Sequence, residues 1–211
     1  MKIIWSLFLV LFLTACQSSV ISELVTRSGQ SLYHDDFSDP SSGWTQADGA
    51  NGALGYSNGT YHMQVISSGY DLWAISRQAY RDVQIEVDAT RLAGPAYNRF
   101  GLICRFQDID DLYNFFISSD GYYTIGKIKN GTTSLLGQEM MVYNTAIVQG
   151  DGPNHLRFDC VGDTLRGYVN GLLIANVTDA DFSSGDVGLI AGAFGEGGVE
   201  VSFDNFVVIK P

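Results

Sequence analysis

The chain has 211 residues with 24 glycines, only 4 prolines and 12% aromatic residues, a profile that suits short strands joined by tight turns. Its formal net charge is -11, and no basic cluster occurs along it. Because nucleic acids and anionic lipid headgroups attract basic surfaces, this charge argues against both as partners. The length suits one domain with a sizeable core.

The first residues are typical of a processing signal. Lys2 precedes an apolar run over residues 3–13, which is too short to span a bilayer comfortably. The run ends in the letters LTAC, with Cys16 last, and this resembles the lipobox of bacterial lipoproteins. The resemblance implies that residues 1–15 are a signal peptide and that Cys16 is acylated. Its acyl chains would anchor the protein outside the cytoplasm, to the bacterial cell membrane or the outer membrane. The alternative is an ordinary secretory signal that ends near a cysteine.

Residues 16–31 are polar and lack a sustained period, so we expect the lipidated cysteine and a tether there, followed by one domain over residues 32–211. Alternation of apolar and polar residues in this domain predicts roughly twelve to fourteen strands. The first is marked by Leu32, Tyr33 and Phe37. The others are expected at residues 54–57, 60–66, 70–76, 82–92, 99–106, 112–119, 122–128, 132–136, 155–161, 164–169, 172–177, 186–194 and 199–209.

Tight hairpins are predicted where an Asn-Gly pair separates two strands, at residues 58–59, 130–131 and 170–171, because both turn residues must adopt positive φ. Short strands at regular spacing, with no convincing helix of three turns, predict an all-β fold: a two-sheet antiparallel sandwich. Residues 138–153 are the least periodic part of the domain, and a short helix around residues 138–146 is the alternative there.

Two cysteines remain once Cys16 is set aside, in a compartment that permits disulfides. Strand parity places Cys104 on the side of Leu102, and Cys160 on the side of Phe158, so both point into the core. We therefore predict a Cys104–Cys160 disulfide, with two buried free thiols as the alternative.

The opposite faces of the same strands are where a ligand is expected. Arginine, asparagine and tyrosine alternate there with core residues, and such a face suits the apolar ring faces and hydroxyl edges of a sugar. The ligand-binding candidates are Arg105, Asn114, Tyr123, Arg157, Arg166 and Tyr168. Trp44 and Trp73 could add a stacking platform. The alternative is that these side chains cover a solvated sheet and that the tryptophans fill the core.

No cofactor is expected, and calcium is the one metal that the sequence suggests. Asp36 near the first strand and Asp204 near the last offer the hard oxygen ligands that Ca²⁺ prefers, and terminal strands often pair in sandwiches. Aspartates in turns are also common for backbone reasons alone, which is the alternative.

Several segments in this order carry a resemblance to a known fold family. They are DDFSDPSSGW, DVQIEVDATRLAGP, FGLICRFQDIDDLYNFFISSDGYYTIGKI, GDTLRGYVNGLLIANVTD, GDVGLIAG and VSFDNFVV. Together they resemble the concanavalin A-like lectin/glucanase superfamily, and more narrowly laminin-G-like modules and the 3-keto-disaccharide hydrolase domain family. The resemblance covers about residues 33–209. It implies a jelly roll of two packed sheets, one of them concave, and many members of the superfamily bind glycans on that concave face.

The resemblance also allows a test for catalytic residues. Laminarinase-type hydrolases of the superfamily carry E-x-D-x-E or E-x-D-x-x-E on one strand, and Glu86 and Asp88 match the first two positions. Thr90 and Arg91 stand where the second glutamate belongs, so the sequence favours a protein that is not an enzyme. We therefore expect a lipid-anchored envelope protein that binds a glycan or cell-wall polysaccharide without cleaving it. A hydrolase similar to the 3-keto-disaccharide family and a structural lipoprotein with no sugar ligand are the alternatives.

Overall fold

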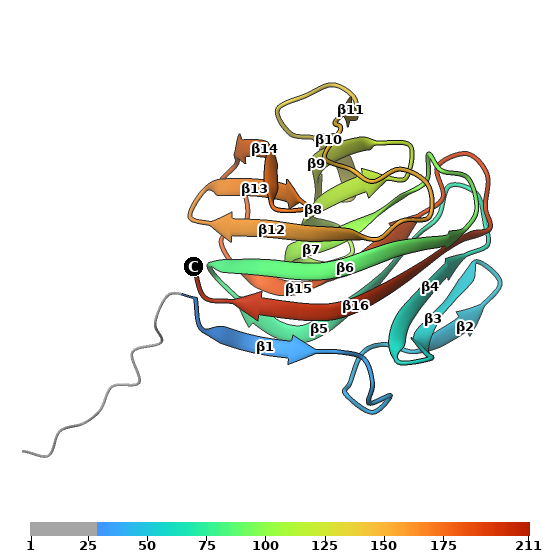
Figure 1. Ribbon diagram of the computed structural model, residues 1–211. Coiled ribbons are helices and arrows are strands. Elements are labelled where there is room, and N and C mark those ends of the chain that lie inside the picture. The colour runs from blue at the N-terminus through green and yellow to red at the C-terminus, as the bar shows by residue number, and fades with distance from the viewer. Residues whose placement is uncertain (1–28) are drawn as a thin grey trace, which may run out of the picture.

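Two antiparallel sheets lie face to face in the computed structural model, which describes residues 29–211 (Figure 1). One sheet has nine strands in the order β14-β13-β12-β6-β16-β4-β3-β2, with β1 beside β16. The other has seven strands in the order β10-β9-β8-β7-β15-β5, with β11 beside β9. The prediction of an all-β two-sheet sandwich is confirmed.

The nine-stranded sheet consists of β1 (Ser31–Asp35), β2 (Ala47–Gly49), β3 (Gly52–Ser57), β4 (Thr60–Val65), β6 (Val83–Ala93), β12 (Asn154–Val161), β13 (Thr164–Val169), β14 (Leu172–Thr178) and β16 (Val199–Ile209). The seven-stranded sheet consists of β5 (Asp71–Tyr80), β7 (Arg99–Asp108), β8 (Asp111–Ser118), β9 (Tyr122–Lys129), β10 (Thr132–Leu135), β11 (Val142–Tyr143) and β15 (Gly185–Gly192).

The three Asn-Gly hairpins form as predicted. Asn58, Asn130 and Asn170 have φ of 53°, 50° and 51°, and the glycine after each also has positive φ. This geometry matches the twist of the flanking strands. The alternative of a short helix around residues 138–146 is wrong, because this segment contains β11, which pairs with β9. In residues 29–211 no helix is long and apolar enough to cross a membrane.

The chain joins the sandwich slightly earlier than expected. The Gly29 amide donates to the Lys210 carbonyl at 2.8 Å, and the Lys210 amide donates to the Gln30 carbonyl at 2.9 Å. The segment before β1 therefore pairs beside the end of β16, near the C-terminus in Figure 1. The predicted signal peptide at 1–15, the lipidated Cys16 and most of the predicted tether lie outside the described residues.

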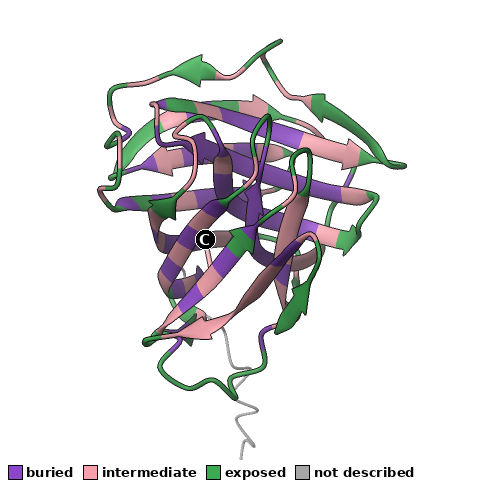
Figure 2. Ribbon diagram, turned by 90° about the vertical axis from the view of Figure 1, so that its right-hand side faces the viewer, coloured by how far each residue is buried: buried purple, intermediate pink, exposed green. Residues whose placement is uncertain are grey.

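The main core fills the space between the sheets (Figure 2). On β6, Val83, Ile85 and Val87 are buried while Glu86 and the residues at the other alternate positions are partly exposed, as the alternation predicts. The Cys104–Cys160 disulfide joins β7 to β12, and so links the two sheets through this core, with 6.8 Å between the Cα atoms. The disulfide prediction is confirmed.

The seven-stranded sheet also buries apolar side chains on its other face. Ile103, Leu112, Phe116 and Ile190 form a second cluster, separate from the main core. They alternate along their strands with residues of the main core, so they lie on the outer face of this sheet. Strand β8 is consequently buried along nearly its whole length rather than at alternate positions. This outer face is a second packed surface rather than a solvated one.

Candidate functional site

A groove with a volume of about 770 Å³ lies over the outer face of the seven-stranded sheet. This size is typical of small-molecule sites. Its floor is formed by alternate residues of β8, β9 and β15, and its sides by the segments that follow β10 and β15. The floor includes Asn114, Phe116, Thr124, Gly126, Ile128 and Ile190, and the sides include Tyr97, Leu135, Met140, Met141 and Phe194.

Asn114 is the polar residue at the bottom of the groove. Its side chain is only 3% exposed, and its Cα partners in the sheet are Ile103 on one side and Gly126 on the other. No other described residue forms a hydrogen bond with its carboxamide. A Cβ atom at position 126 would lie 2.7 Å from Asn114 Oδ1, so the glycine leaves space for this amide. Because its side-chain amide atoms face the groove and have no protein partner within residues 29–211, both the donor and the acceptor of Asn114 are available to a ligand.

An ion pair closes the polar end of the groove. Arg99 of β7 donates to both carboxylate oxygens of Asp71 of β5, at 2.8 and 3.0 Å through Nη2. Strand β15 lies between these two strands, and its Gly192 makes the contact possible, because a Cβ there would lie 1.8 Å from Asp71 Oδ1. The Arg99 guanidinium also lies 5.1 Å from the centre of the Phe116 ring. The Asp71 carboxylate and the Phe116 ring together fix the position of the guanidinium over the floor of the groove.

Large apolar side chains reach into solvent along the groove. Met140 is 71% exposed on the β10 side, and Phe194 is 73% exposed on the β15 side. Tyr97 and Tyr122 are also exposed, and the Tyr122 ring packs edge-on against Tyr143. Exposed apolar residues gathered around one hollow are typical of a binding site.

The groove also carries negative charge that its arginine does not balance. Asp71 is paired with Arg99, whereas Asp120 accepts a hydrogen bond from the Ser118 hydroxyl and Glu139 is exposed on the side of the groove. Neither Asp120 nor Glu139 has a cationic partner within the part of the chain that the structure describes. Electrostatically, the groove suits neutral or positively charged ligands.

The residues predicted to bind a ligand do not lie together. Arg157, Arg166 and Tyr168 share the outer face of the nine-stranded sheet, where Arg157 stacks 4.7 Å from the Tyr168 ring and pairs with Asp159. Asn114 lies on the outer face of the opposite sheet. Of the predicted side chains, Asn114 alone lines the groove.

The prediction for Tyr123 is wrong, because this ring packs against the core between the sheets. Its neighbour Tyr122 faces the groove instead, together with Thr124 and Gly126. Trp44 is buried in the core, where its indole donates to Asp35, so the alternative for this residue is confirmed.

The prediction for Arg105 is also wrong. Its side chain is 2% exposed and donates to the carbonyl oxygens of Phe182 at 2.7 Å and Gly162 at 2.6 Å. It has φ of 53° and lies where the pairing of β7 with β8 shifts register, so ordinary strand parity does not apply. Burial lowers the pKa of the guanidinium, while the nearby Tyr113 and Asp82 raise it. Arg105 thus joins loops of the sandwich rather than facing a ligand.

Glu86 and Asp88 lie on the outer face of the nine-stranded sheet, away from the groove. His155 lies between them, with Nδ1 at 2.8 Å from Asp88 and Nε2 at 3.5 Å from Glu86. Asp88 also accepts a hydrogen bond from Asn205. These carboxylates are thus part of a surface hydrogen-bond network, as expected from the solvated face of a strand.

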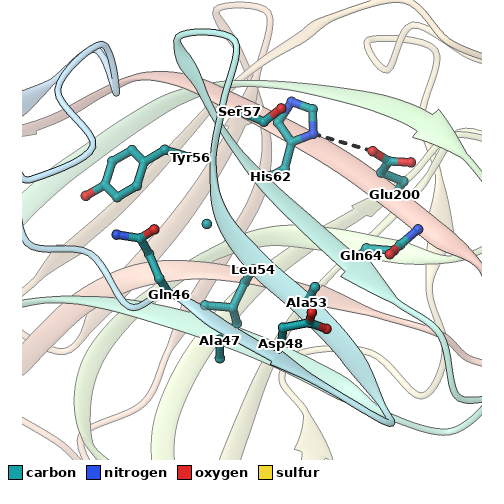
Figure 3. A pocket seen from close by; sticks show the side chains of 11 residues that line it. Gln46, Ala47, Asp48, Ala53, Leu54, Tyr56, Ser57, His62, Gln64 and Glu200 are labelled. Carbon is teal, nitrogen blue, oxygen red and sulfur yellow. Dashed lines mark ion pairs between the residues drawn. The ribbon is translucent and has the colours of Figure 1, made fainter.

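Another hollow, of about 550 Å³, lies over β2, β3 and β4 (Figure 3). Three of its polar side chains have partners in the protein. His62 points toward Glu200 at 3.4 Å, the Tyr56 hydroxyl accepts from the Trp44 amide, and Gln46 donates to the Pro40 carbonyl. Because it is smaller than the groove and no large exposed apolar side chain of the described residues borders it, this hollow is a weaker candidate.

The predicted calcium ligands are engaged in local turns. Asp36 accepts hydrogen bonds from the amide and hydroxyl of Ser38, and Asp204 accepts from the Asn205 amide. Residues 29–211 contain no group of three or more histidine, cysteine, aspartate or glutamate side chains that could hold a metal ion.

Several solved structures share the fold of this sandwich. No family model and no curated protein matches the chain. A carbohydrate-binding module, CBM66 from Bacillus subtilis, is 21% identical with a TM-score of 0.64, over 80% of this chain and 96% of that one.

Two further solved structures support the same fold. A protein of unknown function with a galectin-like fold from Bacillus subtilis is 11% identical with a TM-score of 0.62, over 87% of this chain and 97% of that one. A β-glucanase from Bacillus licheniformis is 15% identical with a TM-score of 0.59, over 88% of this chain and 100% of that one. At these identities the likeness shows the fold alone.

Proposed function

We propose that the protein binds a glycan in the groove of the seven-stranded sheet and does not cleave it. The observation that carries this proposal is the buried carboxamide of Asn114, unpartnered among residues 29–211, at the bottom of a groove bordered by exposed aromatic rings. The fold shared with a carbohydrate-binding module supports it.

The chemistry of the groove matches that of a sugar ring. A sugar has apolar faces, which pack on aromatic and apolar side chains such as Tyr122 and Phe116, and polar edges, which need hydrogen-bond partners. Asn114 offers both a donor and an acceptor, and Arg99 adds further donors at the polar end. A few polar groups in a largely apolar hollow are the usual composition of a specific binding site.

Binding without cleavage is supported by the state of the carboxylates. Glycoside hydrolysis ordinarily needs two carboxyl groups on either side of the scissile bond. Of the three carboxylates in the groove, Asp71 is held by Arg99 in a two-point ion pair, Asp120 accepts a hydrogen bond from Ser118, and Glu139 is exposed on its side. The Glu86–Asp88 pair lies on the other sheet. The proposal therefore assigns the groove to recognition.

A glycan array with the purified full-length protein tests this proposal. Tyr122→Ala removes an exposed ring from the groove, and Tyr168→Ala is its matched control on the outer face of the nine-stranded sheet. We expect Tyr122→Ala to weaken binding about tenfold or more, corresponding to roughly 1.4 kcal/mol, and Tyr168→Ala to leave it unchanged. The opposite ranking, or no bound glycan at all, contradicts the proposal. Release of shorter sugars from a bound glycan contradicts its non-catalytic part.

We also propose that the protein is held at the bacterial envelope by lipid on Cys16. The support is the LTAC motif after the apolar run, together with a Cys104–Cys160 disulfide that suits an oxidising compartment. Growth with labelled palmitate tests this, with Cys16→Ser as the variant. Label in the wild-type protein and none in the variant is the expected result, and an unlabelled wild-type protein contradicts it.

A further inference from the structure

We infer that the groove selects sugars that carry an N-acetyl group, with the ligand amide paired to Asn114 and its methyl group on the apolar floor. This inference rests on the proposed glycan-binding function and specifies its ligand class.

The first support is the shape of the hydrogen-bonding group at the floor. A carboxamide presents an acceptor oxygen and a donor nitrogen side by side, and both are free of partners among the described residues at Asn114. The carbonyl of an N-acetyl group accepts from the Asn114 amide nitrogen, and a neighbouring ring hydroxyl donates to the Asn114 oxygen, so both atoms of the carboxamide gain a partner. The acetyl methyl group, which a plain hydroxyl lacks, is then brought against the floor of the groove.

The second support is what surrounds that carboxamide. Of the apolar side chains that line the groove, Phe116 lies two residues from Asn114 on the same strand and face, Ile128 lies two residues from its sheet partner Gly126, and Ile190 lies on β15. A hydroxyl pressed against these side chains would lose its water without replacement, at a cost of roughly 1–3 kcal/mol. A methyl group next to the amide gains from the same contact.

The third support is charge. Asp120 and Glu139 have no cationic partner in the part of the chain that is described, so a carboxylated, sulfated or phosphorylated sugar would be repelled. An N-acetyl sugar is neutral. A free amino sugar would be attracted by the same carboxylates, and the experiment must therefore distinguish the acetylated sugar from its amine.

Binding of three matched tetrasaccharides by the purified full-length protein tests the inference. They are β-1,4-linked oligomers of N-acetylglucosamine, glucosamine and glucose, and a parallel galactose-based series removes dependence on one ring stereochemistry. We expect the acetylated member of at least one series to bind tenfold or more tightly than its two partners. Salt should not change this order.

Two variants assign the selectivity to the floor. Asn114→Ala should reduce the preference for the acetylated sugar to within about twofold, while Asn114→Asp, which keeps size and acceptor but loses the donor, should also lose the preference. Asn176→Ala is the control, since that asparagine is exposed on β14 of the other sheet. Thermal unfolding of each variant reports whether it folds.

The outcomes separate the two proposals. Equal binding of acetylated and non-acetylated sugars, or tighter binding of the amine, overturns the N-acetyl inference and leaves glycan binding in place. A preference that survives Asn114→Ala in a folded variant also overturns it. No binding to any glycan on an array overturns both.

Discussion

Replacement of Arg105 distinguishes a structural role from a ligand-binding one. The guanidinium is buried and donates to the carbonyl oxygens of Phe182 and Gly162, with a longer contact of 3.4 Å to that of Arg81. Arg105→Ala removes all three donors at once. The carbonyl oxygens it leaves behind are in a space that water reaches poorly, because Arg105 is 2% exposed.

The magnitude follows from these contacts. A hydrogen bond to a charged group contributes about 1.5–3 kcal/mol, so the two short ones together give roughly 3–6 kcal/mol. The ion pair with Asp82, at 3.6 Å and with a carboxylate 41% exposed, adds little. For a domain of this size each kcal/mol shifts Tm by about 2–4 °C, so Arg105→Ala should lower Tm by roughly 6–24 °C.

Thermal and urea unfolding measure the effect, with Arg166→Ala as the matched control, because Arg166 is partly exposed on the outer face of β13. We expect the control to lose less than about 1 kcal/mol. At temperatures where Arg105→Ala is folded, its glycan affinity should equal that of the wild type. A variant with normal stability and lost binding would refute our interpretation and return Arg105 to the ligand site.

Three further changes have expected outcomes. Cys104→Ala with Cys160→Ala opens a link across a sequence separation of 56 residues and should lower the unfolding free energy by about 4 kcal/mol in urea titrations, so an unchanged midpoint would contradict it. Burial raises the pKa of Asp179, but hydrogen bonds led by that from Lys127 outweigh it and lower the pKa below 3.8. This carboxylate therefore stabilises the fold above about pH 4 and loses its contribution as pH falls through the lowered pKa, so Asp179→Asn should flatten the loss of stability between neutral and acid pH, and a parallel profile would be evidence against it. Gly192→Ala should break the ion pair at the polar end of the groove and weaken glycan binding more than it weakens folding, which paired binding and unfolding measurements can check.

Much of the sandwich could be predicted from local sequence patterns. The alternation on β6 and the Asn-Gly turns specify strands and hairpins through contacts between neighbouring residues, and the parity of Cys104 and Cys160 was enough to predict their disulfide. The strands and hairpins depend on residues that are close in the chain, and the disulfide depends on two cysteines that have only each other as partners in the domain.

The site was harder to predict, because it depends on which sheet each strand joins. Asn114 and Arg157 both alternate with core residues, yet they lie on opposite outer faces of the sandwich. Strand β8 shows no alternation to follow, since both of its faces are buried. At Arg105 a shift of register changes the face of the sheet to which the side chain points. Tyr122 and Tyr123 are adjacent tyrosines, so alternation did not indicate which of the two faces the core.

Amide chemical shifts in an ¹⁵N-labelled sample, followed while the best glycan from the array is added, test the location of the site most directly. We predict that the changes gather on β7, β8, β9 and β15, with Asn114, Gly126 and Gly192 among them. Changes gathered instead around Arg157 and Tyr168, on the other sheet, would contradict the assignment of the groove.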